Sequence, residues 1–515
     1  MQTSLIKFGR LTDFLCGALL LSFTLTIAYP RWRTGFDWGD EGFLAYSAVR
    51  VMQGEVPHRD FVSLQPPLSF YTVAGIFKLF GTSLASQRVL GLSIFLLLPL
   101  LIYGVGRNFT GPIVSCAAAA PACMFGIASY NFVPLAVWQG IAASLVAVLF
   151  FLPAVFSRRR WLAFPAGLLT AASLFLRHDQ AVYTIMSILA LAIALGIARG
   201  DSISRADLKQ ALLFWLAGIG IALIPAIFIW WRLGALPEMF RQLILFPFTT
   251  YRKTSARPFP RLFVWRSGWE TTLVLLFYLL PLVQAIAALC LVRSLIRRQL
   301  RRRGAILAFL IIWSALFYLQ VIIRADIIHL VITLPPFFLL VAFGWSIVHE
   351  KVGNHRKLDI AFCAVSTVLV AWVLCMPFAF PYVAGQSEQL TLDRGGVLVS
   401  PAQAHKIADF VRHVQASVPP DRSILALPYI PMFYFLCERR NPTRWSYLWP
   451  GDQTAHDHER LIQEAESDPP ALVLLSQQRE VAAFAPAIIS YVHAHYLWTS
   501  DFGDVGTYAR KSEPR

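Results

Sequence analysis

Residues 36–46 read FDWGDEGFLAY, and they directly follow the first long apolar segment of the chain. Asp37, Asp40 and Glu41 lie in this stretch, and Asp60 follows at a distance. Residues 1–387 hold only 14 Asp and Glu against 33 Lys and Arg, yet five of those acids fall between residues 37 and 60. Because acidic side chains beside a bilayer cost free energy and usually have a functional role, this local enrichment indicates a functional site.

The composition excludes an ordinary soluble globule. Of the 515 residues, 57% are hydrophobic, whereas soluble domains contain roughly 45–50% apolar residues. Apolar runs long enough for a hydrocarbon core of roughly 30 Å predict eleven spans, at about residues 12–29, 87–106, 112–128, 135–156, 161–176, 180–198, 211–231, 271–292, 304–323, 327–347 and 359–380. The sequence therefore predicts an α-helical polytopic membrane protein.

The basic connections between these spans predict the orientation. Lys and Arg stay cytoplasmic far more often than not, and counting every span puts the basic connections on one side: Lys7 and Arg10, Arg107, 158–160, 199–209, 293–303 and 351–357. We therefore expect a multi-pass protein of the cell inner membrane with a cytoplasmic N-terminus and an extracytoplasmic C-terminus. The first span lacks a small-residue cleavage site, which favours a retained helix over a signal peptide.

The net charge of the chain changes sign at about residue 388. Residues 388–515 carry a net charge of −3, so residues 1–387 carry +19. This excess lies mostly in the predicted cytoplasmic loops and does not indicate nucleic-acid binding. Hydropathy also drops there, and helices alternate with short apolar strands, which predicts a small extracytoplasmic α/β domain. We expect a transmembrane domain over residues 1–387 and this second domain over residues 388–515.

The outside loop of residues 30–86 is expected to contain two short juxtamembrane helices. Asp40 can cap a helix from Glu41 to about residue 53, and Pro66 and Pro67 can open a second helix over residues 68–80. Each helix is apolar on one face, so both are expected to lie in the plane of the membrane interface.

Residues 40–46 read DEGFLAY, and further landmarks follow in the loop: Gly54, Pro57, Asp60, Phe61, Pro66, Pro67, Leu68, Tyr71 and 79–81. This pattern resembles the first outside loop of the polyprenol-phosphate-dependent type C glycosyltransferases, the nearest members being bacterial relatives of the protein O-mannosyltransferases and the lipid A aminoarabinose transferase. The resemblance covers residues 36–82 and, in general layout, the eleven spans. It implies that Asp40 is the catalytic base, that Glu41 or Asp37 supports it, and that no cofactor is needed.

The acidic pair has an alternative interpretation. Asp is a favoured N-cap and Glu suits the first turn of a helix, so Asp40 and Glu41 could simply begin a helix. A carboxylate in this place can instead act as a general base toward a hydroxyl or amine. An acidic cluster can also hold a divalent metal, although none is predicted.

Residues 176–180, LRHDQ, form a second polar cluster at an outside turn between two predicted spans. His178 and Asp179 either belong to an ordinary polar turn or line the binding site. We expect them to line the site, because Arg, His and Asp together exceed what a turn requires and the turn faces the same side as Asp40.

Residues 324–329, RADIIH, form a third cluster at the outside end of a predicted span. Asp326 and His329 share a helix face, and the guanidinium of Arg324 can grip a phosphate in a bidentate way. An arginine–aspartate pair that only anchors the helix end is the alternative.

The fourth cluster is an outside segment, residues 250–266, that contains no acid and five cations: Arg252, Lys253, Arg257, Arg261 and Arg266. Such an excess runs against the cytoplasmic bias of basic residues. We expect Arg252, Lys253 and Arg257 to bind an anionic lipid headgroup or phosphate, with unspecific headgroup contact as the alternative.

The function predicted from these features is transfer of a sugar from a polyprenyl-phosphate donor to a lipid, glycan or protein acceptor on the outer membrane face. The sequence has neither a Gly-Lys-Ser phosphate loop nor a dinucleotide fingerprint, which fits a donor that is activated beforehand. A transporter or flippase would predict internal repeats and charges at mid-span, and neither is found. A scaffold working through its outer domain would leave the loop carboxylates unexplained.

Overall fold

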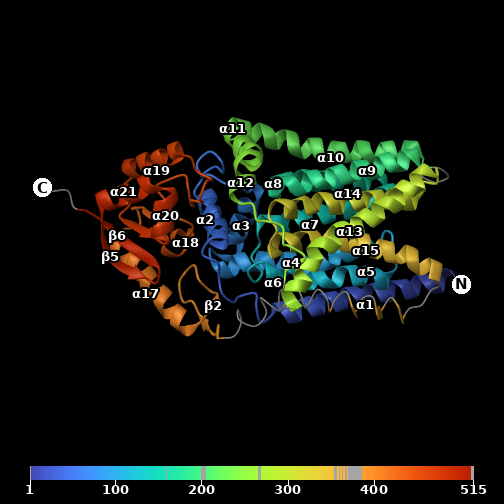
Figure 1. Cartoon of the computed structure of the whole chain (residues 1–515), viewed down its shortest axis with the longest axis horizontal. Helices are drawn as coiled ribbons and strands as arrows, with labels where there is room; N and C mark the ends of the chain where they lie inside the picture. Colours follow the sequence, from blue (N-terminus) through green and yellow to red (C-terminus); the bar gives the residue numbers. More distant parts are fainter. Residues whose placement is uncertain are drawn as a thin grey trace. The chain divides into compact units, whose positions relative to one another are not determined.

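The computed structural model describes residues 2–157, 159–198, 204–264, 268–352, 357–358, 360–361, 364–365, 368 and 385–511 (Figure 1). Their backbone is mostly helical, with a small sheet toward the C-terminus. The chain forms two compact units. Unit 1 comprises Met1–Trp32, Gly91–Phe228 and Arg257–Val383, and unit 2 comprises Arg33–Leu90, Ile229–Ala256 and Ala384–Arg515.

Among the described residues, eight helices are long and apolar enough to cross a membrane. They are α1 (Gln2–Ala28), α4 (Leu84–Gly106), α7 (Ala136–Phe156), α9 (His178–Ile197), α10 (Arg205–Arg232), α13 (Gly268–Ile296), α14 (Arg302–Ile323) and α15 (Ile327–Val352). Each coincides with a predicted span. The prediction of a polytopic helical membrane protein is therefore confirmed.

Two of the other three predicted spans form shorter helices. Residues 112–128 are divided into α5 (Pro112–Ala119), a 3-10 turn η1 (Ala120–Met124) and α6 (Phe125–Ala128). Pro121 in the 3-10 turn lacks the N–H that a continuous helix would need. Residues 160–176 form η2 (Arg160–Leu162) and α8 (Ala163–Leu176). The predicted span at 359–380 lies mostly outside the described residues, so the count of eleven stays a prediction.

The helices of unit 1 pack through small and hydroxyl-bearing residues. α7 packs along α8, and α14 packs against both α9 and α15. A Cβ on Gly167 of α8 would lie 2.9 Å from the backbone nitrogen of Ile219 in α10, so only glycine permits this approach. The Trp313 indole donates to the Thr184 hydroxyl at 3.2 Å across α14 and α9. Such interhelical bonds are typical of helices in lipid.

Unit 2 begins with the two helices of the outside loop, α2 (Asp40–Met52) and α3 (Leu68–Phe80), which pack on each other. Residues 236–254 then form short helical turns: α11 (Leu236–Phe240), η3 (Arg241–Leu245), η4 (Pro247–Tyr251) and α12 (Arg252–Thr254). The C-terminal part contributes β1 (Glu388–Gln389), β2 (Leu398–Val399), α17 (Pro401–Ser417), β3 (Ile424–Leu427), α18 (Met432–Cys437), α19 (Ala455–Ser467), β4 (Leu472–Leu475), α20 (Gln478–Phe484), α21 (Pro486–His495), β5 (Tyr496–Phe502) and β6 (Val505–Arg510).

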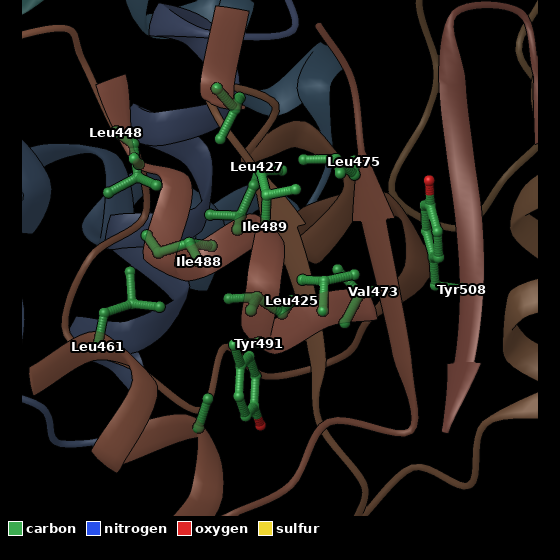
Figure 2. Packing of buried hydrophobic residues seen from close by; sticks show 14 of the residues in the cluster. Leu425, Leu427, Leu448, Leu461, Val473, Leu475, Ile488, Ile489, Tyr491 and Tyr508 are labelled. Carbon is green, nitrogen blue, oxygen red and sulfur yellow. The ribbon is translucent and has the colours of Figure 1, made fainter. Parts of the chain in front are cut away.

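A four-stranded sheet organises the C-terminal part, with strand order β3-β4-β6-β5. β3 and β4 pair in parallel, whereas β6 pairs antiparallel with β4 and with β5. Figure 2 shows Leu425 and Leu427 of β3 and Val473 of β4 packed with Ile488 and Leu461 in the core. The α/β character predicted for this region is confirmed. β3 and β4 are short and wholly buried, as parallel strands usually are.

The loop helices were predicted almost to the residue, with one correction. Gly39, not Asp40, occupies the N-cap position of α2, and Asp40 is the first helical residue. Residues 41–50 are all buried, and in unit 2 α2 packs against both α3 and α18. The placement of the two helices in the plane of the membrane interface stays a prediction.

Candidate active site

The acids of the outside loop divide into paired and unpaired carboxylates. Three of the five are held by arginines: Glu41 by Arg88, Glu55 by Arg50 and Asp60 by Arg59, with shortest distances of 2.5, 2.6 and 2.8 Å. Within the part of the chain that the structure describes, Asp37 and Asp40 have no cationic partner. The loop therefore leaves two carboxylates side by side whose charge is not neutralised.

Glu41 is fully buried in a bidentate ion pair. The Arg88 guanidinium donates to Oε1 at 2.5 Å through Nε and to Oε2 at 2.8 Å through Nη2, and both side chains are 0% exposed. Arg88 also donates to the carbonyl of Gly35 at 3.2 Å. Since both oxygens of Glu41 are occupied, this residue orients the start of α2 and supports its neighbours.

Asp37 and Glu41 are tied together by reciprocal bonds. The Asp37 backbone N–H donates to Glu41 Oε2 at 3.0 Å, and the Glu41 N–H donates to Asp37 Oδ2 at 3.3 Å. Asp37 thus supplies the side-chain cap that Gly39 cannot. Burial, reinforced by the negative charges of Asp40 and Glu41, raises the pKa of Asp37 to about 6.

Asp40 is partly exposed and makes one described side-chain contact. The phenol of Tyr429, which lies between β3 and α18, donates a hydrogen bond to Asp40 Oδ1. Oδ2 has no hydrogen-bond partner among the described residues, which leaves its lone pairs available to a proton donor. Glu41, by contrast, has both oxygens occupied.

The third predicted cluster is assembled in unit 1. Asp326 Oδ2 accepts from Arg324 Nε at 2.8 Å, and Asp326 Oδ1 accepts from the His329 backbone N–H at 2.9 Å and lies 2.7 Å from His329 Nδ1. Burial opposes the charge on Asp326, but the bonds and charge of His329 and the charge of Arg324 outweigh it and lower the pKa of Asp326 to about 2. Asp326 is therefore an anion that orients the guanidinium of Arg324.

Arg257 of the basic segment belongs to the same cluster. Its backbone N–H donates to the Ile323 carbonyl at 3.3 Å, and its Nη1 lies 3.9 Å from Asp326 Oδ2. Two arginines thus approach the same carboxylate. Arg252 and Lys253 lie in α12 of unit 2, exposed and without an acidic partner among the described residues. Arg266 lies outside the described residues.

The second predicted cluster forms the first turn of α9. Asp179 Oδ1 accepts from Arg177 Nε at 2.9 Å and from the Gln180 N–H at 2.9 Å. His178 begins the helix, and Asp179 is about one-fifth exposed. Asp179 therefore serves its own turn, as the ordinary interpretation of this motif predicts, and its role in binding stays a prediction.

Sequence reasoning missed two residues of the acidic site. Arg88 could have been noticed as a lone arginine at the outside end of an apolar span, against the cytoplasmic bias of such residues. Tyr429 carried no signal, because it lies 389 residues from its partner. In the described part of the chain, no group of three His, Cys, Asp or Glu residues is arranged to hold a metal ion.

No protein-family model matches the chain, and no curated protein sequence matches it. Solved structures do match it, over nearly its whole length. ArnT from Cupriavidus metallidurans, bound to undecaprenyl phosphate, matches 97% of this chain and 98% of its own with 13% identity and a TM-score of 0.56. The oligosaccharyltransferase AglB from Archaeoglobus fulgidus, in complex with an inhibitory peptide and a dolichol-phosphate, matches 97% of this chain and 74% of its own with 14% identity and a TM-score of 0.57.

Both structures are polyprenyl-phosphate-dependent type C glycosyltransferases. The chain therefore has the type C glycosyltransferase fold, and the fold resemblance read from residues 36–82 is confirmed. Identities of 13 and 14% establish the fold alone, because one fold can host several functions.

Proposed function

We propose that the protein is a membrane glycosyltransferase that moves a sugar from a polyprenyl-phosphate donor to an acceptor on a lipid, glycan or protein. The observation that carries the proposal is the pair of unneutralised carboxylates, Asp37 and Asp40, in a loop whose other acids are all paired with arginines. A carboxylate without a counterion can accept a proton, whereas one locked in a buried ion pair cannot do so without leaving a buried charge.

In this reaction Asp40 is the general base. Its Oδ2 takes the proton of the acceptor hydroxyl while the acceptor oxygen bonds to the anomeric carbon of the sugar. The bond between that carbon and the donor phosphate oxygen breaks, and the polyprenyl phosphate leaves with the electron pair. Asp37 is the weaker candidate, because one of its oxygens caps α2.

The leaving phosphate requires positive charge, which the basic clusters would supply. Arg324 is oriented by Asp326 at 2.8 Å, and arginine binds phosphate through two parallel hydrogen bonds. Arg252, Lys253 and Arg257 would add further positive charge for the phosphate or neighbouring lipid headgroups. The related structures support this choice of donor, because ArnT holds undecaprenyl phosphate and AglB a dolichol-phosphate. The two related folds are transferases, which gives the transporter alternative no support.

Replacing Asp40 tests the proposal directly. Purified protein is given a panel of undecaprenyl-phosphate-linked sugars, and release of undecaprenyl phosphate is measured. Asp40→Asn should lower turnover by about 10²- to 10⁴-fold, the usual contribution of a general base. The matched control is Asp60→Asn in the same loop, because Asp60 is paired with Arg59. No release by the wild type from any donor would contradict the donor class, and near wild-type turnover of Asp40→Asn would remove Asp40 from the mechanism.

The proposed orientation places the acidic loop and the C-terminal region outside the cell inner membrane and the N-terminus in the cytoplasm. Single cysteines at the exposed positions 258 and 450 should then react with an impermeant thiol reagent in intact cells. Cysteines at 159 and 301, also exposed, should react only after permeabilisation. Labelling of position 301 in sealed cells would reverse the orientation.

A further inference from the structure

We propose that Tyr429, a residue of the C-terminal region, is a positioning residue for the base: it holds Oδ1 of Asp40 so that Oδ2 faces the acceptor hydroxyl. This inference rests on the proposed function and deepens it. It assigns to residues 428–431, between β3 and α18, the task of completing the active site.

The segment that carries Tyr429 is seated closely on the start of α2. A Cβ added to Gly39 would lie 2.5 Å from Tyr429 Cε1 and 2.8 Å from Cδ1, and one added to Gly42 would overlap the backbone of Met432. Real Cβ atoms do not approach other atoms so closely. The two glycines at the start of the acidic helix are therefore what allows this segment to reach Asp40.

Backbone and ring contacts fix the position of this segment relative to the start of α2. The Met432 N–H donates to the Trp38 carbonyl at 3.2 Å, and the Trp38 ring stacks on Phe433 with centroids 4.7 Å apart. Trp38 lies between Asp37 and Asp40, so the contact fixes the backbone that presents both acids. The packing that places the Tyr429 hydroxyl also places its acceptor.

The Tyr429 ring is in turn held from its other side. Tyr447 and Trp449 meet it edge to face, with centroid separations of 5.7 and 6.2 Å. Burial raises the pKa of the Tyr429 hydroxyl well above its usual value, and the charges of Asp40 and Asp37 add to this effect. The phenol therefore keeps its proton and remains a hydrogen-bond donor at every pH at which the enzyme could work.

A donor fixed in this way restrains rotation of the carboxylate base, so that one oxygen stays directed at the substrate. Small misplacements of a reacting group can lower rates by about 10²-fold.

The test compares Tyr429→Phe with Tyr447→Phe in the full-length protein, using release of undecaprenyl phosphate from a sugar-linked donor as the readout. Both variants remove one phenolic hydroxyl from the same aromatic cluster, but only that of Tyr429 contacts Asp40. Tyr429→Phe should lower kcat about 10-fold or more without raising the KM for the donor, the kinetic equivalent of losing a hydrogen bond to a charged group. Tyr447→Phe should leave kcat unchanged.

Two further variants keep the outcome interpretable. Gly39→Ala retains the hydroxyl but displaces the ring, so it should reproduce the loss of kcat if positioning is what matters. Adding Tyr429→Phe to Asp40→Asn should cause no further loss, because the two residues act as one unit. An unchanged kcat in Tyr429→Phe, with Asp40→Asn inactive, overturns the positioning role alone. An active Asp40→Asn overturns the proposed base itself.

Discussion

Neutralising one member of the Glu41–Arg88 pair should destabilise the protein strongly, whereas neutralising both should cost much less than the sum. Both side chains are 0% exposed and share two hydrogen bonds, of 2.5 and 2.8 Å. Removing one partner leaves an uncompensated buried charge, which costs about 3–5 kcal/mol. Arg88→Met further leaves the Gly35 carbonyl without its donor at 3.2 Å.

The choice of substitution isolates the charge. In Glu41→Gln the amide oxygen can still accept from the Asp37 N–H, as Oε2 does at 3.0 Å. The double variant Glu41→Gln with Arg88→Met contains no buried charge at this position. We therefore expect each single variant to lose about 3–5 kcal/mol of the free energy of unfolding, and the double variant to lose at least about 2 kcal/mol less than their sum.

The assay is a double-mutant cycle on the free energy of unfolding in mixed detergent micelles, with transferase activity measured on the same samples. Recovery of activity in the double variant would establish that Glu41 orients the loop and that its charge takes no part in proton transfer. A cost below about 1 kcal/mol for Glu41→Gln would refute the reasoning, because it would mean that water reaches the pair and that Glu41 is available for chemistry.

Two other predictions concern ionisation and phosphate binding. The pKa of Asp37 is raised to about 6 from 3.8, so the folded state binds the Asp37 proton more tightly than the unfolded state, and wild-type stability falls as pH rises from about 4 to about 6. Asp37→Asn should remove this fall and stabilise the protein by up to about 3 kcal/mol above pH 6. If the free energies of unfolding of the wild type and the variant changed with pH in the same way, the prediction would be wrong. Arg324→Met should weaken binding of undecaprenyl phosphate about 10-fold or more, and an unchanged affinity in equilibrium binding would assign Arg324 to anchoring α15 through Asp326.

Hydropathy and local sequence signals were sufficient to predict the long helices and the loop helices of this protein. The apolar runs predicted all eight of the long apolar helices found among the described residues, because a span needs only a continuous apolar stretch of sufficient length. The proline pair at residues 66 and 67 and Gly81 placed α3 at Leu68–Phe80. These features depend only on residues that are close together in the sequence, which is why they could be predicted from one sequence. The start of α2 was misjudged by one residue, because Asp37 caps the helix from outside it.

The sequence also determined that the acidic loop was the candidate active site, since five of the 14 acids of residues 1–387 lie there. Only the tertiary structure decided which acids are unpaired. Arg88 lies 47 residues from Glu41, and Tyr429 lies 389 residues from Asp40. Adjacent carboxylates look alike in a sequence, but their chemistry depends on charge, burial and hydrogen bonds from distant segments, and these partners are brought together only by packing.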